Sequence, residues 1–207
     1  MGFIPEFLAP APSAVAITFA ERLAVITGHA LITGRAILVA FFLGLAFAVG
    51  VSTLTFSWRV FQLLFEPILV LSQVIPKVAL APIILVLMGK GIESRALVGA
   101  LICFFPFYSN IMQGLRSVGQ ELILQARLAA KPEVEILFCL RFIFAVPYLV
   151  SAARSAILLA VIGVIVAEFL GLSDGLGFLI LDSSARFDTR MMFASITAIS
   201  ITAGLFY

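Results

Sequence analysis

Charged residues are scarce in this 207-residue sequence, making up 12% of it with a net charge of +2. A soluble domain carries about twice that share of charge. Here 63% of the residues are hydrophobic and the mean hydropathy is +1.22. This balance excludes an ordinary water-soluble domain, and the small net charge argues against a nucleic-acid-binding protein. The composition predicts an integral membrane protein that is surrounded by membrane lipid.

Residues that commonly take part in chemistry are also few. His29 is the single histidine, and Cys103 and Cys139 lie in or beside apolar segments without the spacing of metal ligands. The GxxxxGK[ST] nucleotide-binding motif is missing, because Gly89–Gly91 lacks both the upstream glycine and the following hydroxyl. The one GxSxG sequence, Gly171–Gly175, lies in a glycine-rich turn between apolar segments and does not support a nucleophile elbow, which joins a strand to a helix. We therefore expect no bound metal, no cofactor and no enzymatic activity in this chain.

What the sequence does contain is a series of long uncharged segments. Backbone polar groups in lipid need internal partners, so a spanning protein is a helix bundle or a closed barrel. These segments are longer than the alternating stretches of about 10 residues that build a barrel. We predict an all-α, polytopic membrane helix bundle in one domain, residues 1–207, with a loop at Ser52–Trp58. The five predicted spans are Ala30–Val51, Val60–Met88, Ala96–Leu115, Phe144–Ala167 and Asp188–Tyr207.

The ends of the sequence are unusual. The first residues are rich in proline, and Tyr207 lies inside an apolar run. We expect a chain truncated at one or both ends.

One segment, residues 116–143, interrupts the apolar sequence with charge. Its charged residues are Arg116, Glu121, Arg127, Lys131, Glu133, Glu135 and Arg141. Residues 121–130 suit a short helix with four apolar residues to bury: Leu122, Leu124, Ala126 and Leu128. Pro132 should break it, and Glu133–Phe142 should begin a second helix. A helix, break and helix at the membrane surface predict a contact for another protein.

Polar residues within the predicted spans are candidates for a translocation path, because such groups usually face a cavity or a partner. They are Gln73, Ser109, Asn110, Arg154 and Glu168. The prolines of Val60–Met88 predict a broken helix that lines a cavity, or one that bends for packing alone. Arg154 could pair with a substrate anion or a carboxylate, or extend to the interface. For Glu168 the alternative is packing at a helix end.

Four stretches, in this order, resemble the inner-membrane permease subunits of binding-protein-dependent ABC importers, in the nitrate, sulfonate and taurine branch. They are Ala9–Val15, Phe65–Gly91, Phe104–Leu122 and Ala167–Ile180. The third matches the entry to the family's cytoplasmic loop. The fourth, AEFLGLSDGLGFLI, is similar to the family's A-E-x-x-G-x-x-x-G-L-G-x-x-I segment. The branch also includes permeases for thiamine precursors and riboflavin-like solutes.

The resemblance implies a type I ABC importer permease-like fold in which residues 116–143 are the cytoplasmic coupling loop. The family's E-A-A-x-x-x-G signature falls on Leu124–Ala130, where Ala126 is retained and Ala130 replaces the glycine. The residues then expected to contact the ATPase subunit are Leu124, Gln125, Ala126, Arg127, Leu128, Ala130 and Pro132. Basic residues are balanced between the two sides, so the positive-inside rule does not orient the chain. Only the resemblance places residues 116–143 on the cytoplasmic side of the membrane.

The resemblance also implies partners, a location and a function. The partners are a cytoplasmic ATP-binding subunit, a second permease copy, most simply as a homodimer, and an external solute-binding protein. The location is the cell inner membrane. The function is import of a small nitrate-, sulfonate- or taurine-like solute, or alternatively of a thiamine or riboflavin precursor. Two other classes remain open from the residues alone: an ion-coupled secondary transporter and a membrane-embedded enzyme.

Overall fold

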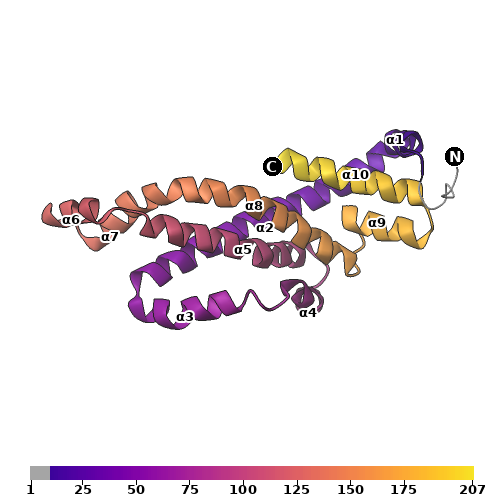
Figure 1. Ribbon diagram of the computed structural model, residues 1–207. Helices are drawn as coiled ribbons and strands as arrows, with labels where there is room; N and C mark the ends of the chain where they lie inside the picture. Colours follow the sequence, from indigo (N-terminus) through magenta and orange to yellow (C-terminus); the bar gives the residue numbers. More distant parts are fainter. Residues whose placement is uncertain (1–9) are drawn as a thin grey trace.

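The computed structural model describes residues 10–207, and every regular element within that range is helical. The longer helices are α1 (Pro12–Glu21), α2 (Leu23–Ser57), α3 (Arg59–Leu71), α5 (Ile92–Arg116), α8 (Phe142–Phe169), α9 (Leu176–Ala185) and α10 (Thr189–Phe206). The shorter ones are the 3-10 helix η1 (Lys77–Leu80), α4 (Ala81–Met88), α6 (Gln120–Leu128), α7 (Glu133–Glu135) and the π-helical η2 (Ile136–Arg141). The predicted all-α fold is confirmed. The molecule is elongated, with α2, α5 and α8 along its length (Figure 1).

Four helical segments are long and apolar enough to cross a membrane. They are α2, α5, α10 and the continuous run Glu133–Phe169, which joins α7, η2 and α8. Each contains or overlaps a predicted span. The loop expected at Ser52–Trp58 was wrong, because α2 continues to Ser57 and bends away only at Trp58. The Thr53 hydroxyl donates to the Val49 carbonyl at 2.7 Å, which satisfies this polar side chain within the helix.

The remaining predicted span, Val60–Met88, is broken as the prolines suggested. α3 ends at Leu71, and the chain then turns before η1 and α4 resume. Pro76 immediately precedes η1, where proline removes a backbone donor and restricts the residue before it. Pro67, in contrast, lies inside α3 without ending it. This stretch therefore consists of three short helices in place of one spanning helix.

The core lies between α2, α5 and α8, whose backbones approach closely at small residues. A Cβ atom added to Gly163 of α8 would lie 2.6 Å from the Cα atom of Gly99 on α5. One added to Gly114 would lie 2.5 Å from the Cα atom of Ala145. Small residues permit this close packing, which is important between membrane helices because the hydrophobic effect does not drive their association in lipid. The three helices thus form one tightly packed unit.

The other helices surround this unit unevenly. α10 packs against α1 and α9 through a second apolar cluster around Ile26, Leu176 and Ala194. α4 packs against α5 and α8 around Ala81 and Val98. Much of the surface of α3 and α4 nevertheless remains apolar and exposed. In Figure 1, α3 and α4 lie along one side of the bundle, and α6 and α7 extend from one end.

Candidate functional site

The charged segment leaves the bundle between α5 and α8 and forms its own small unit. α5 ends at Arg116, and α6 begins at Gln120 after a short turn in which Val118 is buried. Figure 1 shows α6 and α7 at the end of the molecule opposite α9 and α10. The sequence-predicted helix, break and second helix are confirmed, because α6 is followed by Pro132 and then by α7.

The end of α6 has a specific hydrogen-bonded geometry. The Lys131 amide donates to the Ala126 carbonyl at 3.1 Å, and the Ala130 amide donates to the Arg127 carbonyl at 2.9 Å. This pair of bonds is a Schellman motif, which needs a left-handed residue directly after the helix cap. Ala130 supplies that residue with a φ of 56°. The resemblance placed Ala130 where family members have glycine, and the geometry explains a preference for glycine there.

Two exposed ion pairs bridge the break, one from Arg127 of α6 and one from Lys131, which follows α6. Arg127 Nε donates to Glu133 Oε1 at 2.7 Å, and Lys131 Nζ donates to Glu135 Oε1 at 2.6 Å. The hydrogen bond that Lys131 donates to the Glu135 carboxylate raises the pKa of Lys131. Both glutamates also lie in the first turn of the second helix, where negative charge is favourable. These contacts set the angle of the break at Pro132.

The leucines of α6 are exposed and are not covered by any part of residues 10–207. None of its residues is buried, and Leu124 and Leu128 are 59% and 79% exposed. These two leucines are four residues apart and so share one face of the helix. Of the residues expected to be buried, Leu122 is also exposed and Ala126 is half-buried. The described chain therefore leaves this apolar face open.

Arginines at both ends of the segment connect it to the bundle. Arg116 Nη2 donates to both carboxylate oxygens of Glu66 on α3, each at 2.9 Å. Arg141 Nη1 donates to the Leu115 carbonyl at 2.8 Å, and its guanidinium lies 4.7 Å from the centre of the Phe56 ring. These contacts join the two ends of the segment to α2, α3 and α5.

The predicted path residues fall on different parts of the fold. Ser109 and Asn110 are half-buried on α5, where the Asn110 amide donates to the Pro106 carbonyl at 2.8 Å. Gln73 lies in the break after α3 and accepts a hydrogen bond from Lys77 Nζ at 3.2 Å. Lys77 also lies 5.7 Å from the centre of the Phe105 ring on α5. Lys77 adds polarity to the predicted break but was not among the predicted path residues, and its contact with α5 joins segments far apart in the sequence.

Arg154 lies on a different face from these residues. It is exposed on α8 and lines a pocket of about 280 Å³ with residues of α2, α8 and the C-terminal end, among them Phe41 and Phe206. No carboxylate within residues 10–207 is placed to pair with it. The structure therefore does not bring Arg154 together with Gln73, Ser109 or Asn110.

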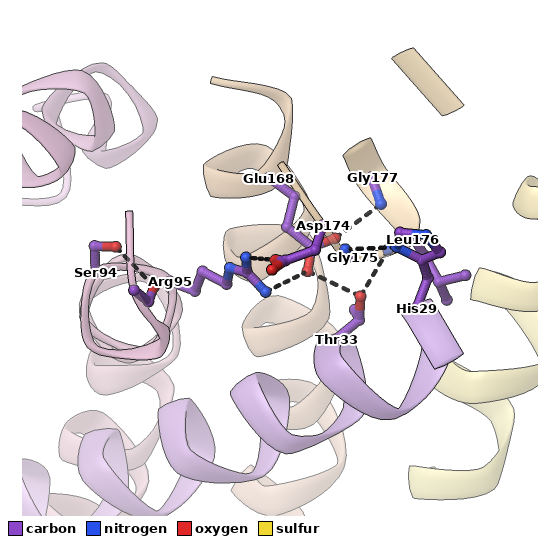
Figure 2. A network of polar contacts seen from close by, with 10 residues as sticks. His29, Thr33, Ser94, Arg95, Glu168, Asp174, Gly175, Leu176 and Gly177 are labelled. Carbon is purple, nitrogen blue, oxygen red and sulfur yellow. Dashed lines mark hydrogen bonds and ion pairs between the residues drawn. The ribbon is translucent and has the colours of Figure 1, made fainter. Parts of the chain in front are cut away.

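Glu168 is buried in a polar network at the other end of the bundle (Figure 2). Its carboxylate accepts hydrogen bonds from the Thr33 hydroxyl and the Gly177 amide, each at 2.8 Å, and lies 3.7 Å from Arg95. Arg95 is itself 3% exposed and also pairs with Asp174. The network connects α2, α5, α8 and the start of α9.

The glycine-rich turn before α9 completes this network. Gly175 has a φ of 101°, a left-handed conformation that favours glycine. Its amide donates to His29 Nδ1 at 3.0 Å, and the next amide, that of Leu176, donates to the Thr33 hydroxyl at 2.8 Å. Together with the Glu168 carboxylate these acceptors satisfy the free amides at the start of α9. The turn is thereby fixed against α2 and α8.

The spans, the broken α3–α4 stretch and the helical segment at one end agree with a sequence match to a known family. Residues 37–207 match the family described as binding-protein-dependent transport system inner membrane component. A probable ABC transporter permease protein of Haemophilus influenzae is 31% identical over 100% of this chain and 85% of its own length. The chain belongs to this family.

Further relatives define the class more closely. The riboflavin transport system permease protein of Chloroflexus aurantiacus is 33% identical, over 95% of this chain and 74% of that protein. The putative aliphatic sulfonates transport permease protein of Bacillus subtilis is 27% identical, over 99% and 75%. This protein is accordingly a multi-pass inner-membrane permease subunit of an ABC importer. It is not an enzyme, since ATP hydrolysis lies in a separate ATP-binding subunit, and a solute-binding protein completes the system.

The family assignment decides between the classes that the residues left open. It favours the ATP-driven importer over an ion-coupled secondary transporter and over a membrane-embedded enzyme. Within residues 10–207, no three His, Cys, Asp or Glu side chains are grouped so as to hold a metal ion.

Proposed function

We propose that residues 116–143 are the cytoplasmic coupling segment, and that α6 docks in a groove of the ATP-binding subunit. The observation that carries this proposal is the open apolar face of α6. Leu124 and Leu128 are exposed on a helix that leaves the bundle, and nothing within residues 10–207 covers them. Burying two leucines against a partner would contribute about 3–6 kcal/mol before the costs of association.

The contact is proposed to extend along α6 and over the break. Its residues are Leu124, Gln125, Ala126, Arg127, Leu128, Ala130 and Pro132. The Schellman motif and the Arg127–Glu133 pair fix the direction in which the chain leaves α6. ATP-driven closure of the partner subunits would displace this unit, and Arg116 and Arg141 would transmit the displacement to the spans.

We further propose that the translocation path forms between two copies of the chain, most simply as a homodimer in lipid. The broken α3–α4 stretch supports this, because irregular backbone at membrane depth is tolerated where it lines a cavity. Gln73, Ser109 and Asn110 are the path residues of this proposal. Glu168 makes its contacts inside the closed network, so we place it outside the path as a positioning residue. Arg154 is proposed to face lipid headgroups or the second copy.

The solute is proposed to be a small nitrate-, sulfonate- or taurine-like compound. The likeness to a putative aliphatic sulfonates permease over nearly the whole chain supports this. The second candidate, a riboflavin or thiamine precursor, is favoured by the likeness to a riboflavin permease, which has the higher identity. Both candidates use the same architecture and the same coupling.

The coupling proposal is tested by placing a charge on the open face of α6. In the assembled importer, Leu124→Asp and Leu128→Asp should prevent co-purification of the ATP-binding subunit and abolish ATP-dependent uptake, because an ion cannot be buried there without a partner. Leu122→Asp is the matched control, since Leu122 is also exposed but points away from that face. It should retain the complex. Equal loss in all three variants, or none in any, would contradict docking through this face.

A further inference from the structure

Lys77 has an unusual position for a charged residue. It lies half-buried at the break between α3 and α4, inside a stretch that is otherwise almost entirely apolar. The stretch's other charged residue, Glu66, pairs with Arg116. Among the described residues, no carboxylate lies within ion-pair distance of Lys77. A cation at membrane depth is costly unless it faces water or meets an opposite charge.

Several hydrogen-bond donors around Lys77 are not used by contacts within the described residues. The ammonium donates one hydrogen bond to Gln73 Oε1 at 3.2 Å and lies 5.7 Å from the centre of the Phe105 ring. Two further ammonium protons and the Gln73 amide protons remain without a described acceptor. Ser109 lies one helical turn after Phe105 on the same face of α5, where its hydroxyl accepts a long 3.5 Å bond from Gln113. Gln73 and Lys77 lie at the break, and the contact of Lys77 with Phe105 places the break against α5, the helix that carries Ser109.

We infer that Lys77, Gln73 and Ser109 form a binding site for the anionic group of the transported solute, of the sulfonate or carboxylate class. The inference rests on the proposed function, because it assumes that this face lines the translocation path. An anion here would receive donors from all three side chains and would neutralise the unpaired cation. Glu66, the other charged residue of this stretch, is already paired with Arg116. An uncharged solute would leave the lysine unpaired.

The strength of such a site fits transport. A lysine ammonium is a single charge on a flexible stem, unlike the planar fork with which arginine grips carboxylates and phosphates. The Phe105 ring supports the ammonium from one side without neutralising it. A passing anion is therefore attracted but not held tightly, as a path requires.

The test measures the local preference for anions without knowledge of the natural solute. Ser109→Cys is introduced with Cys103→Ala and Cys139→Ser, and the chain is assembled with its ATP-binding subunit in membrane vesicles. The rates of modification by anionic sulfonatoethyl methanethiosulfonate and cationic trimethylammonioethyl methanethiosulfonate are then compared. The rate of each reagent is divided by its rate with a small free thiol in solution, which corrects for the different intrinsic reactivities of the two reagents. The comparison is repeated with Lys77→Gln and with Lys77→Arg.

The site predicts that the anionic reagent reacts preferentially, and that Lys77→Gln lowers the anion-to-cation rate ratio on the order of tenfold. Lys77→Arg should preserve the ratio. Ser184→Cys on the exposed part of α9 is the matched control, and its ratio should not respond to Lys77. A ratio at Ser109→Cys that is unchanged by Lys77→Gln would overturn the anion site while leaving the path in place. No reaction with either reagent would overturn the proposed path, and the site with it.

Discussion

Replacing Ala130 by glycine tests the geometry of the coupling segment at its most unusual residue. Ala130 has a φ of 56°, and the left-handed conformation costs a residue with a Cβ atom about 1 kcal/mol or more. Glycine adopts it without that cost. Ala130→Gly should therefore stabilise the end of α6 by about 1 kcal/mol, although glycine is usually a destabilising choice near a helix.

The added stability should appear in the local opening of α6 and not in the unfolding of the whole protein, because α6 contributes no buried residue and can open without unfolding the bundle. Hydrogen–deuterium exchange of the permease in lipid measures this opening. The amides of Ala130 and Lys131, which donate to the Arg127 and Ala126 carbonyls, report it directly. A stabilisation of about 1 kcal/mol should slow their exchange about fivefold.

Ala129→Gly is the matched control for this experiment. Ala129 has an ordinary φ of −77°, so glycine there relieves nothing and adds conformational freedom to the unfolded chain. It should leave the exchange unchanged or accelerate it. If the two substitutions change the exchange rate in the same direction, the left-handed conformation of Ala130 and the Schellman motif are refuted.

Two further substitutions test the packing of the bundle by thermal unfolding in detergent. Glu168→Ala removes one of the two carboxylates around the buried guanidinium of Arg95 and should lower the free energy of unfolding by about 3–5 kcal/mol. Asp182→Ala, the control, removes an exposed ion pair and should lower it by less than about 1 kcal/mol. Equal effects of the two substitutions would refute a buried network. Gly163→Ala places a Cβ atom against the backbone of α5 and should cost about 1–3 kcal/mol, whereas Gly28→Ala, with nothing within 4 Å, should be neutral or stabilising. A neutral Gly163→Ala would contradict the close crossing of α5 and α8.

The parts of the fold that could be predicted from the sequence are those that local chemistry determines. Long apolar stretches with at most one charge each located α2, α5, α8 and α10, and the prolines located the break before η1. The end of α2 was missed because a hydroxyl-rich stretch is typical of a loop in water. Inside a helix in lipid, the Thr53 hydroxyl instead bonds to the preceding turn.

The candidate site was predictable in outline and not in its contacts. Charge and Pro132 located the segment between α5 and α8, and the resemblance assigned its role. The pairing of Glu168 with Arg95, and the approach of Lys77 to Phe105, join residues on different helices. No local pattern encodes such pairs, because they depend on how the helices pack against one another.

The close crossing of α5 and α8 at Gly99 and Gly163 has a mechanical consequence. Because no side chain separates the two backbones here, sliding would press the larger side chains beside Gly99 and Gly163 against the opposite helix, and we expect the pair to tilt as one body. α5 has 25 residues and is therefore about 37 Å long. A push received by α6 at one end would reach the Arg95 network at the other end as a rotation of this rigid pair.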